Sequence, residues 1–376
     1  MDFGILYELA VPRPWTERSE YDAYWNAIRE VQEAEAQGFS HVWAVEHHFL
    51  EEFSHSSAPE VWLSAVAQHT STIRIGHGVV LVPAGFNHPI RVAERVAALD
   101  ILSNGRVEFG TGRSITQEEL GGFELQPEDS RPMWREAIEL IPKIWMDEGP
   151  ITFHGNYTTI ENRAIRPKPL QKPHPPLWQA CTSPPSYEQA AELGLGVLAF
   201  GMAVSPAAMA SRIRAYREQL ASCKPVGGVV NDQVAVFLLA HCAETDEKAQ
   251  AVAERSFISY LDQTMEYFVG WGRGGNLPPG YEWYASVSEN REELAKRLKF
   301  DYLLENHMLL CGTPERFVET IDLYREAGAD QIIMGMTIGN IPHDEVLSSI
   351  KLIGQEVIPA CRAGSALIAP ADAGAR

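Results

Sequence analysis

The feature that most constrains the fold of this chain is a repeated alternation of short apolar runs with longer helical segments. Eight runs rich in apolar and β-branched residues predict strands, and the segments between them carry apolar residues at helical spacing. The predicted strands cover residues 3–9, 41–48, 73–83, 106–112, 176–182, 196–202, 233–242 and 330–336. Strands that alternate with helices are typical of βαβ units, in which the strands are parallel.

The helical segments end where the sequence provides suitable signals. The segment that begins at Tyr24 closes on Gly38, and the segment that begins at Pro314 closes on Gly328. Proline suits the first turn of a helix, and glycine suits the left-handed residue after its end. Eight units that close on themselves form a single (β/α)8 TIM barrel, which is the predicted fold. A doubly wound open sheet is the alternative, because periodicity does not reveal closure.

The predicted barrel domain covers residues 1–362 of the 376. The seventh and eighth strands are separated by about twice the length that one helix needs, which predicts an insertion at about residues 244–310. Its stretch 268–284 is dense in aromatic residues, glycine and proline; it forms either a lid or substrate wall, or a decorated surface or subunit contact. Residues 363–376 are rich in small residues and are predicted to be a flexible tail.

The composition limits the partners of the chain. Asp and Glu number 50 against 31 Lys and Arg, a net charge of -19 that repels nucleic acid and anionic membranes. The five cysteines are dispersed and include no CxxC pair, so we expect neither a disulfide framework nor a zinc knuckle. There is no recognisable targeting segment and no apolar stretch of membrane-spanning length. We therefore expect a cytoplasmic protein with no membrane partner.

Polar residues gather where the predicted strands end, which is where the active sites of such barrels lie. They are Glu46, His47 and His48 on the second strand, Arg113 after the fourth, and Thr182, Ser183 and Ser186 after the fifth.

Glu46, His47 and His48 do not have the arrangement of a metal site. Neighbouring side chains on a strand point to opposite faces, so these three cannot all reach one ion, and the chain has no HxH or HExxH motif. We predict no metal. On an alternating strand, His47 points to one face and Glu46 and His48 point to the other. The sequence does not show which face lines the barrel interior. A rim histidine that only bonds a neighbouring carboxylate is the structural alternative.

Two segments suit an anion. Arg113 follows two glycines after a strand, and the segment from Thr182 to Ser186 precedes a helix that starts near Tyr187. Guanidinium groups, hydroxyls and free amides at a helix N-terminus bind phosphate. Simple N-capping by Ser186 explains the second segment as well. No Walker or strand-linked GxGxxG motif is present.

Taken in order, these motifs resemble the bacterial luciferase-like flavin-dependent monooxygenase family. The resemblance covers nearly the whole chain apart from the insertion and the tail. The matching stretches are "FGILYE" from Phe3, "GFSHVWAVEHHF" from Gly38, "GHGVVLVPAGFNHPIRVAE" from Gly76, "LDILSNGRVEFGTGR" from Leu99, "RPKPLQKPHPPLWQACTSPPSYEQAAELG" from Arg166, "CGTPERFVETIDLYREAGADQIIM" from Cys311 and "SSIKLIGQEVIP" from Ser348.

The resemblance implies a two-component monooxygenase. Such a barrel binds reduced FMN, supplied by a separate NAD(P)H-dependent flavin reductase, at its open end. O2 adds to flavin C4a, and the resulting peroxide or hydroperoxide oxidises a small apolar organic substrate such as an aldehyde, ketone, terpenoid or aromatic compound. Both hydroxylation and Baeyer-Villiger oxidation stay open. A homodimer is common among relatives and is expected here.

The resemblance also assigns roles to residues. His47 matches a histidine beside the flavin ring, where we expect it to titrate near neutrality and to hold or donate a proton, with Glu46 or His48 orienting it. Gly78 and Val79 match the site of a non-proline cis peptide under the ring. The residues expected to hold the phosphate are Arg113, Arg131, Thr182, Ser183 and Ser186.

One departure from the family pattern concerns Gly112. Luciferase α chains carry a cysteine at the position before the matching arginine, and glycine here predicts a roomier site without light emission. Two alternatives share the fold: an oxidoreductase that transfers hydride with the deazaflavin F420, and a flavin-binding relative without turnover. A hydrolase is disfavoured, because the chain has no nucleophile or metal motif.

Overall fold

The eight predicted strands form a closed parallel barrel. The computed structural model describes residues 1–271, 277–289, 296 and 298–364. β11 pairs with β1, and β9 pairs with both β11 and β8, so the ring has no open edge and the alternative of an open sheet is excluded. The barrel strands are β1 (Asp2–Tyr7), β2 (His41–Ala44), β3 (Arg74–Leu81), β4 (Val107–Gly112), β7 (Leu177–Cys181), β8 (Gly196–Phe200), β9 (Val234–Cys242) and β11 (Gln331–Gly335).

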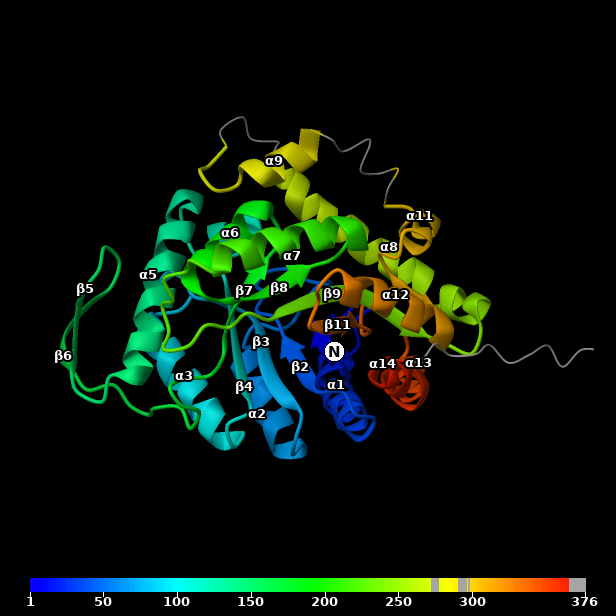
Figure 1. The fold of residues 1–376 in the computed structure, drawn as a ribbon, viewed down its shortest axis with the longest axis horizontal. Coiled ribbons are helices and arrows are strands. Elements are labelled where there is room, and N and C mark those ends of the chain that lie inside the picture. Colours follow the sequence, from blue (N-terminus) through cyan, green and yellow to red (C-terminus); the bar gives the residue numbers. More distant parts are fainter. Residues whose placement is uncertain (272–276, 290–295, 297, 365–376) are drawn as a thin grey trace, which may run out of the picture.

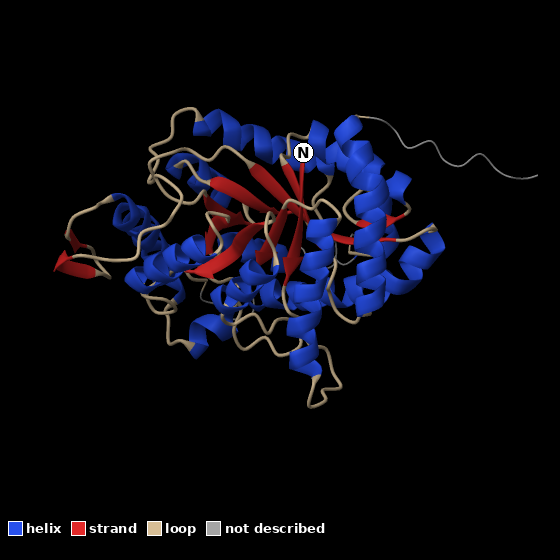
Figure 2. Ribbon diagram, turned by 90° about the horizontal axis from the view of Figure 1, so that it is seen from below, coloured by secondary structure: helices blue, strands red, loops and turns tan. Residues whose placement is uncertain are grey.

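Helices surround the barrel, as Figures 1 and 2 show. Several begin at a proline, whose fixed φ and missing N–H suit the first helical turn. No helix in the described residues is long and apolar enough to cross a membrane. The surrounding helices are α1 (Ser19–Ala36), α2 (Pro59–His69), α3 (Pro89–Leu102), α5 (Pro127–Met146), α6 (Pro184–Leu193), α7 (Pro206–Leu220), α12 (Pro314–Glu326) and α13 (His343–Leu352), which continues through the π-helix η1 (Ile353–Val357) into α14 (Ile358–Ala363).

Three segments are added to the barrel. The short helix α4 (Gln117–Gly122) follows β4. An antiparallel hairpin, β5 (Ile151–His154) and β6 (Thr159–Arg163), was not predicted and projects away from the barrel in Figure 1. The predicted insertion after β9 contains α8 (Asp246–Gly270), α9 (Glu282–Glu289), α11 (Phe300–Glu305) and the short strand β10 (Leu310–Gly312). Residues 365–376 lie outside the described residues, so the predicted tail and the domain limit at residue 362 stay predictions.

The packing of β2 shows which of its side chains face the barrel interior. Trp43 and Val45 pack with Trp178 and Leu198 in a cluster inside the barrel, whereas Val42 and Ala44 belong to the core between the barrel and its helices. β2 ends at Ala44 rather than at residue 48, and the chain continues along the rim. His47 lies beyond the end of β2, so its direction is set by its own contacts rather than by strand parity.

Candidate active site

A cavity opens at the C-terminal ends of the barrel strands. Its empty volume is about 1340 Å³, which includes open solvent at its mouth. The predicted site residues that line it are His47, Gly78, Val79, Arg113, Arg131, Thr182, Ser183 and Ser186, whereas Glu46 and His48 do not.

The His47 imidazole lies between two buried carboxyl groups. Its Nδ1 atom lies 2.9 Å from Glu119 Oε1, and its Nε2 atom lies 3.8 Å from Glu8 Oε2. Both carboxyl groups are almost fully buried. Glu119 therefore orients the ring, and the Nε2 atom is left facing the cavity.

Glu119 is itself held by three further hydrogen bonds. Ser114 and Thr116 donate their hydroxyls to its Oε2 atom at 2.6 and 2.8 Å, and the backbone N–H of His48 donates to its Oε1 atom at 3.1 Å. Thr116 is also the N-cap of α4 and accepts from the Glu119 backbone N–H. The cap of this short helix thus fixes the carboxylate that fixes His47.

Glu46 and His48 do not orient His47, contrary to expectation. They bond each other at 3.1 Å, and Glu46 also accepts from the backbone N–H of Leu81 and from the Asn87 side chain. These contacts tie the rim after β2 to β3. The alternative of a rim histidine that bonds a neighbouring carboxylate therefore describes His48, which bonds Glu46.

Three neighbouring carboxyl groups change the acid strength of His47. Burial lowers its pKa, but Glu119, Glu8 and Glu46 outweigh this and raise the pKa from 6.5 to about 9. Burial raises the pKa of Glu119, yet His47, Ser114 and Thr116 together hold it below its ordinary value. The expectation that His47 titrates near neutrality is therefore wrong: at neutral pH it is an imidazolium, with both ring nitrogens as donors.

We expect this ion pair to make stability depend on pH. A histidine whose pKa is about 9 when folded and about 6.5 when unfolded stabilises the fold fully below pH 6.5, and the contribution is lost as pH rises to 9. We expect the Tm of the wild type to fall by about 5 °C more than that of His47→Gln over this range, because one kcal/mol moves Tm by about 2 °C in a chain this long. Calorimetry at several pH values measures the difference, and equal slopes would contradict it.

At another side of the cavity, Arg113 and Arg131 form a cationic corner. Arg113 donates to Ser130 Oγ at 2.9 Å and to the Gly280 carbonyl at 2.6 Å, and its guanidinium lies over the Tyr281 ring. Arg131 follows Ser130 on α5, and its buried Nε atom has no hydrogen-bond partner in the described part of the chain. Burial and the neighbouring Arg113 lower its pKa. A buried, unpartnered guanidinium atom suits an anionic ligand.

The segment before α6 contributes hydroxyls rather than a row of amides. Pro184 and Pro185 have no N–H, and the Ser186 N–H and hydroxyl both donate to the Ser183 carbonyl. The Ser183 side chain makes no capping hydrogen bond. The expected cradle of free amides is therefore incomplete, and the hydroxyls of Thr182 and Ser183 and the helix dipole are what this segment offers an anion.

The neighbourhood of Gly78 and Val79 differs from expectation in two ways. The cis peptide bonds in the described residues all precede prolines, so the bond between Gly78 and Val79 is not the expected non-proline cis peptide. The pairing of β3 with β4 instead shifts register between His77 and Val80, as in a β-bulge. A Cβ atom on Gly112 would lie 2.8 Å from Val79 Cγ1, so Val79 already occupies the room expected there.

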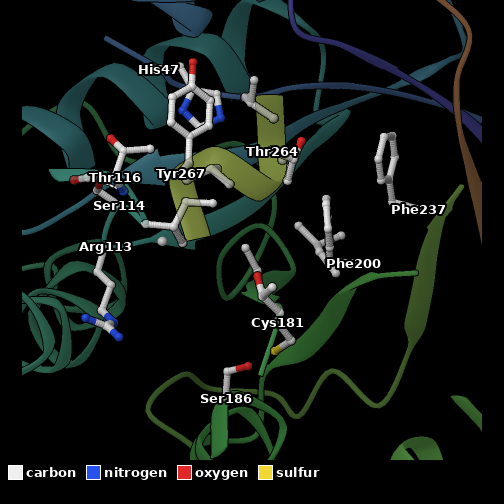
Figure 3. A pocket seen from close by; sticks show the side chains of 18 of the residues that line it. His47, Arg113, Ser114, Thr116, Cys181, Ser186, Phe200, Phe237, Thr264 and Tyr267 are labelled. Atoms are coloured by element: carbon white, nitrogen blue, oxygen red, sulfur yellow. Dashed lines mark hydrogen bonds between the residues drawn. The ribbon is translucent and has the colours of Figure 1, made fainter. Parts of the chain in front are cut away.

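The insertion helix α8 supplies much of the apolar wall. Tyr260, Thr264, Tyr267 and Phe268 of α8 line the cavity together with barrel residues such as Phe200 and Phe237. Figure 3 labels Thr264, Tyr267, Phe200 and Phe237 among them. Of the aromatic residues singled out in the sequence, Phe268 and Tyr284 line the cavity, whereas Trp271 and Trp283 pack behind them. The described part of the insertion thus forms a wall of the site.

In Figure 3, His47 and Tyr267 lie toward one end of the cavity, and Arg113 and Ser186 lie toward the other. Glu8 and Glu119 are the functional candidates that sequence reasoning missed. The Thr116-x-x-Glu119 capping pattern marks Glu119 as a helix-start residue, but its partner is 72 positions away. Among the described residues, no group of three or more His, Cys, Asp or Glu side chains has the arrangement to hold a metal ion.

The barrel and its site define a class: a (β/α)8 protein in which a cationic corner and a largely buried histidine line one apolar cavity. The sequence matches the family described as luciferase-like monooxygenase over residues 1–331, and the chain belongs to that family.

Individual relatives agree with this assignment. Limonene 1,2-monooxygenase of Rhodococcus erythropolis is 27% identical over 95% of this chain and 87% of its own length. The oxygenase component of the flavin-dependent trigonelline monooxygenase of Acinetobacter baylyi is 24% identical over 92% and 91%.

Solved structures share the fold. The oxygenating constituent of 3,6-diketocamphane monooxygenase of Pseudomonas putida, a type II Baeyer-Villiger monooxygenase in complex with FMN, has a TM-score of 0.74 at 20% identity, with 96% of this chain and 98% of that chain covered. The coenzyme F420 dependent tetrahydromethanopterin reductase of Methanopyrus kandleri has a TM-score of 0.68 at 21% identity, with 95% and 98% covered.

Proposed function

We propose that this protein is the oxygenase of a two-component system that uses reduced FMN and O2 to oxidise a small apolar organic compound. The observation that carries the proposal is the cavity itself, which combines the cationic corner of Arg113 and Arg131 with the His47 imidazolium and an aromatic wall. Family membership supports the oxygenase chemistry.

The residues present fit a flavin mononucleotide. The unpartnered Nε atom of Arg131 and the hydroxyls of Thr182 and Ser183 can hold a phosphate. Gln179 also lines the cavity, and its buried Oε1 atom, which has no hydrogen-bond partner among the described residues, can accept from a ring N–H. When bound, reduced flavin supplies the electrons that activate O2.

The chain contributes proton control and the exclusion of water. His47 donates through Nδ1 to Glu119, so its Nε2 proton is the one available to an acceptor in the cavity. Phe200, Phe237 and Phe268 keep the surroundings apolar, which strengthens hydrogen bonds made there and limits side reactions with water.

A separate reductase that supplies the reduced flavin is part of the proposal, supported by the relative named as an oxygenase component. We propose a homodimer as well; Val61 on α2 and Ile101 and Leu102 on α3 are large apolar side chains that the single chain leaves exposed. The proposed location remains the cytoplasm.

We expect the purified protein to bind reduced FMN and to alter its reaction with O2. Anaerobic mixing of the protein with photoreduced FMN, followed by aerated buffer containing cyclic ketones, terpenes or aldehydes, tests this through O2 uptake and product analysis. The same experiment with reduced F420 is the comparison. Binding of F420 with substrate reduction and no O2 uptake would replace the proposal by hydride transfer, and binding of FMN without either reaction would indicate a relative without turnover.

A further inference from the structure

Glu8 is a buried carboxyl group that the proposed function has not yet used. It follows β1, lines the cavity and is 3% exposed. Its Oε1 atom accepts from the Tyr260 hydroxyl at 2.9 Å, whereas its buried Oε2 atom has no hydrogen-bond partner in the described residues. Leaving a buried carboxylate oxygen unpartnered is costly, so this atom needs a physical explanation.

The unpartnered oxygen faces His47. Glu8 Oε2 lies 3.8 Å from His47 Nε2, which is within ion-pair range but too long for a hydrogen bond. Because Glu119 already bonds Nδ1, the two ring nitrogens face two different carboxyl groups. The Nε2–H group is therefore attracted by Glu8 and remains free to donate to a molecule in the cavity.

Glu8 is held in this place from two sides. Tyr260 belongs to the insertion helix α8, and its ring stacks on Phe53, whose ring in turn contacts the His47 ring edge-on. Ser54 donates its hydroxyl to the Glu8 backbone carbonyl at 2.7 Å. The carboxyl group thus has a fixed direction, and the insertion contributes to it.

Glu8 and Glu119 differ in their electrostatic surroundings. Burial raises the pKa of Glu8, whereas nearby His47 and the Tyr260 hydroxyl lower it. The pKa of Glu119 stays below its ordinary value, because its hydrogen bonds and His47 outweigh burial. The titratable groups that act on His47 are Glu119 on α4, Glu8 after β1 and Glu46 after β2. On α8, Tyr260 acts on Glu8, and Glu8 in turn acts on Tyr260 and Tyr267.

We propose that Glu8, held by Tyr260, is a positioning residue that keeps the Nε2 atom of His47 protonated and directed into the cavity. The role rests on the proposed function, in which this proton serves the reaction. When an acceptor takes the proton, the electron pair of the N–H bond stays on Nε2 and His47 becomes neutral. Glu8 then remains as a buried carboxylate without its counter-charge, which favours return of a proton to Nε2.

The test is a pH titration of the histidine rings by NMR in the full-length protein without added flavin. The His47 signal is identified by its loss in His47→Gln. We expect Glu8→Gln to lower the pKa of His47 from about 9 by about one pH unit, because an opposite charge at this distance contributes about that much. Tyr260→Phe, which removes a stabilising donor from the carboxylate, is expected to give a smaller decrease.

Glu46→Gln is the matched control, since Glu46 is equally buried and the substitution removes the same charge from a carboxyl group that bonds His48 instead. It is expected to move the His47 titration less than Glu8→Gln does. An unchanged titration in Glu8→Gln, or an equal change in Glu46→Gln, overturns the proposal. If Glu8→Gln does not fold, Glu8→Asp and Tyr260→Phe take its place, and an unchanged titration in both overturns it.

A second measurement separates this role from the proposed function. The rate at which the protein with photoreduced FMN returns to oxidised flavin in aerated buffer is followed against pH. We expect the limb of the profile that reports His47 to move to lower pH in Glu8→Gln by the same amount as the NMR titration. If the protein does not affect the reaction of reduced FMN at all but the NMR titration still moves, the proposed function fails while the effect of Glu8 on His47 stands.

Discussion

His47→Gln is expected to lower the yield of oxygenated product by about 100-fold or more, with the O2 consumed appearing as hydrogen peroxide. Glutamine keeps a polar side chain of similar reach but cannot carry the charge or the proton, and positioned proton donors contribute typically about 10²–10⁴-fold. The measurement is the ratio of product to peroxide per O2 consumed, with reduced FMN in limiting amount and whichever probe substrate the wild type oxidises.

The neighbouring histidine is the matched control for this prediction. The His48 side chain bonds Glu46 and lies outside the cavity lining, so His48→Gln is expected to keep the product yield within about threefold of wild type. Equal losses in the two variants would show that the histidine pair supports only the rim after β2, and His47 would lose its proposed role.

The order of strands and helices could be predicted because each strand is a short apolar run. The interior sides of β9 and β11 carry apolar residues such as Phe237, Leu239 and Ile333. Closure of the ring could not be predicted, because it depends on the pairing of β8 with β9 and of β11 with β1 and not on any single run. The β5–β6 hairpin was missed because its strands are short, largely exposed and outside the alternating pattern.

The candidate site was predictable only in part. Strand ends and family motifs pointed to His47, Arg113, Arg131 and the segment before α6, and the structure brings these residues to one cavity. The partners of His47 were missed because they depend on distant contacts. Adjacent Glu46 seemed the natural partner, but it bonds His48, and the partner of His47 is Glu119 on α4.

The second large effect is expected at the phosphate corner. Arg131→Ala is expected to weaken the binding of FMN by about 10- to 100-fold, because a hydrogen bond to a charged group contributes about 1.5–3 kcal/mol. Arg131 is a cleaner test than Arg113, whose bonds to Ser130 and Gly280 also hold α5 and the insertion in place. Dissociation constants for reduced FMN are measured by anaerobic fluorescence titration.

Riboflavin, which has the same ring system without the phosphate, shows whether the loss comes from the proposed contact. If Arg131 holds the phosphate, Arg131→Ala weakens FMN binding and leaves riboflavin binding unchanged, whereas a general disturbance of the cavity weakens both. Arg135 is the control for charge, since it lies one turn further along α5 and pairs at the surface with Glu139 and Glu192. We expect Arg135→Ala to bind both ligands as the wild type does. An equal loss of affinity for FMN and for riboflavin in Arg131→Ala would show that Arg131 does not hold the phosphate. The main observation that supports a nucleotide cofactor in this cavity would then be lost.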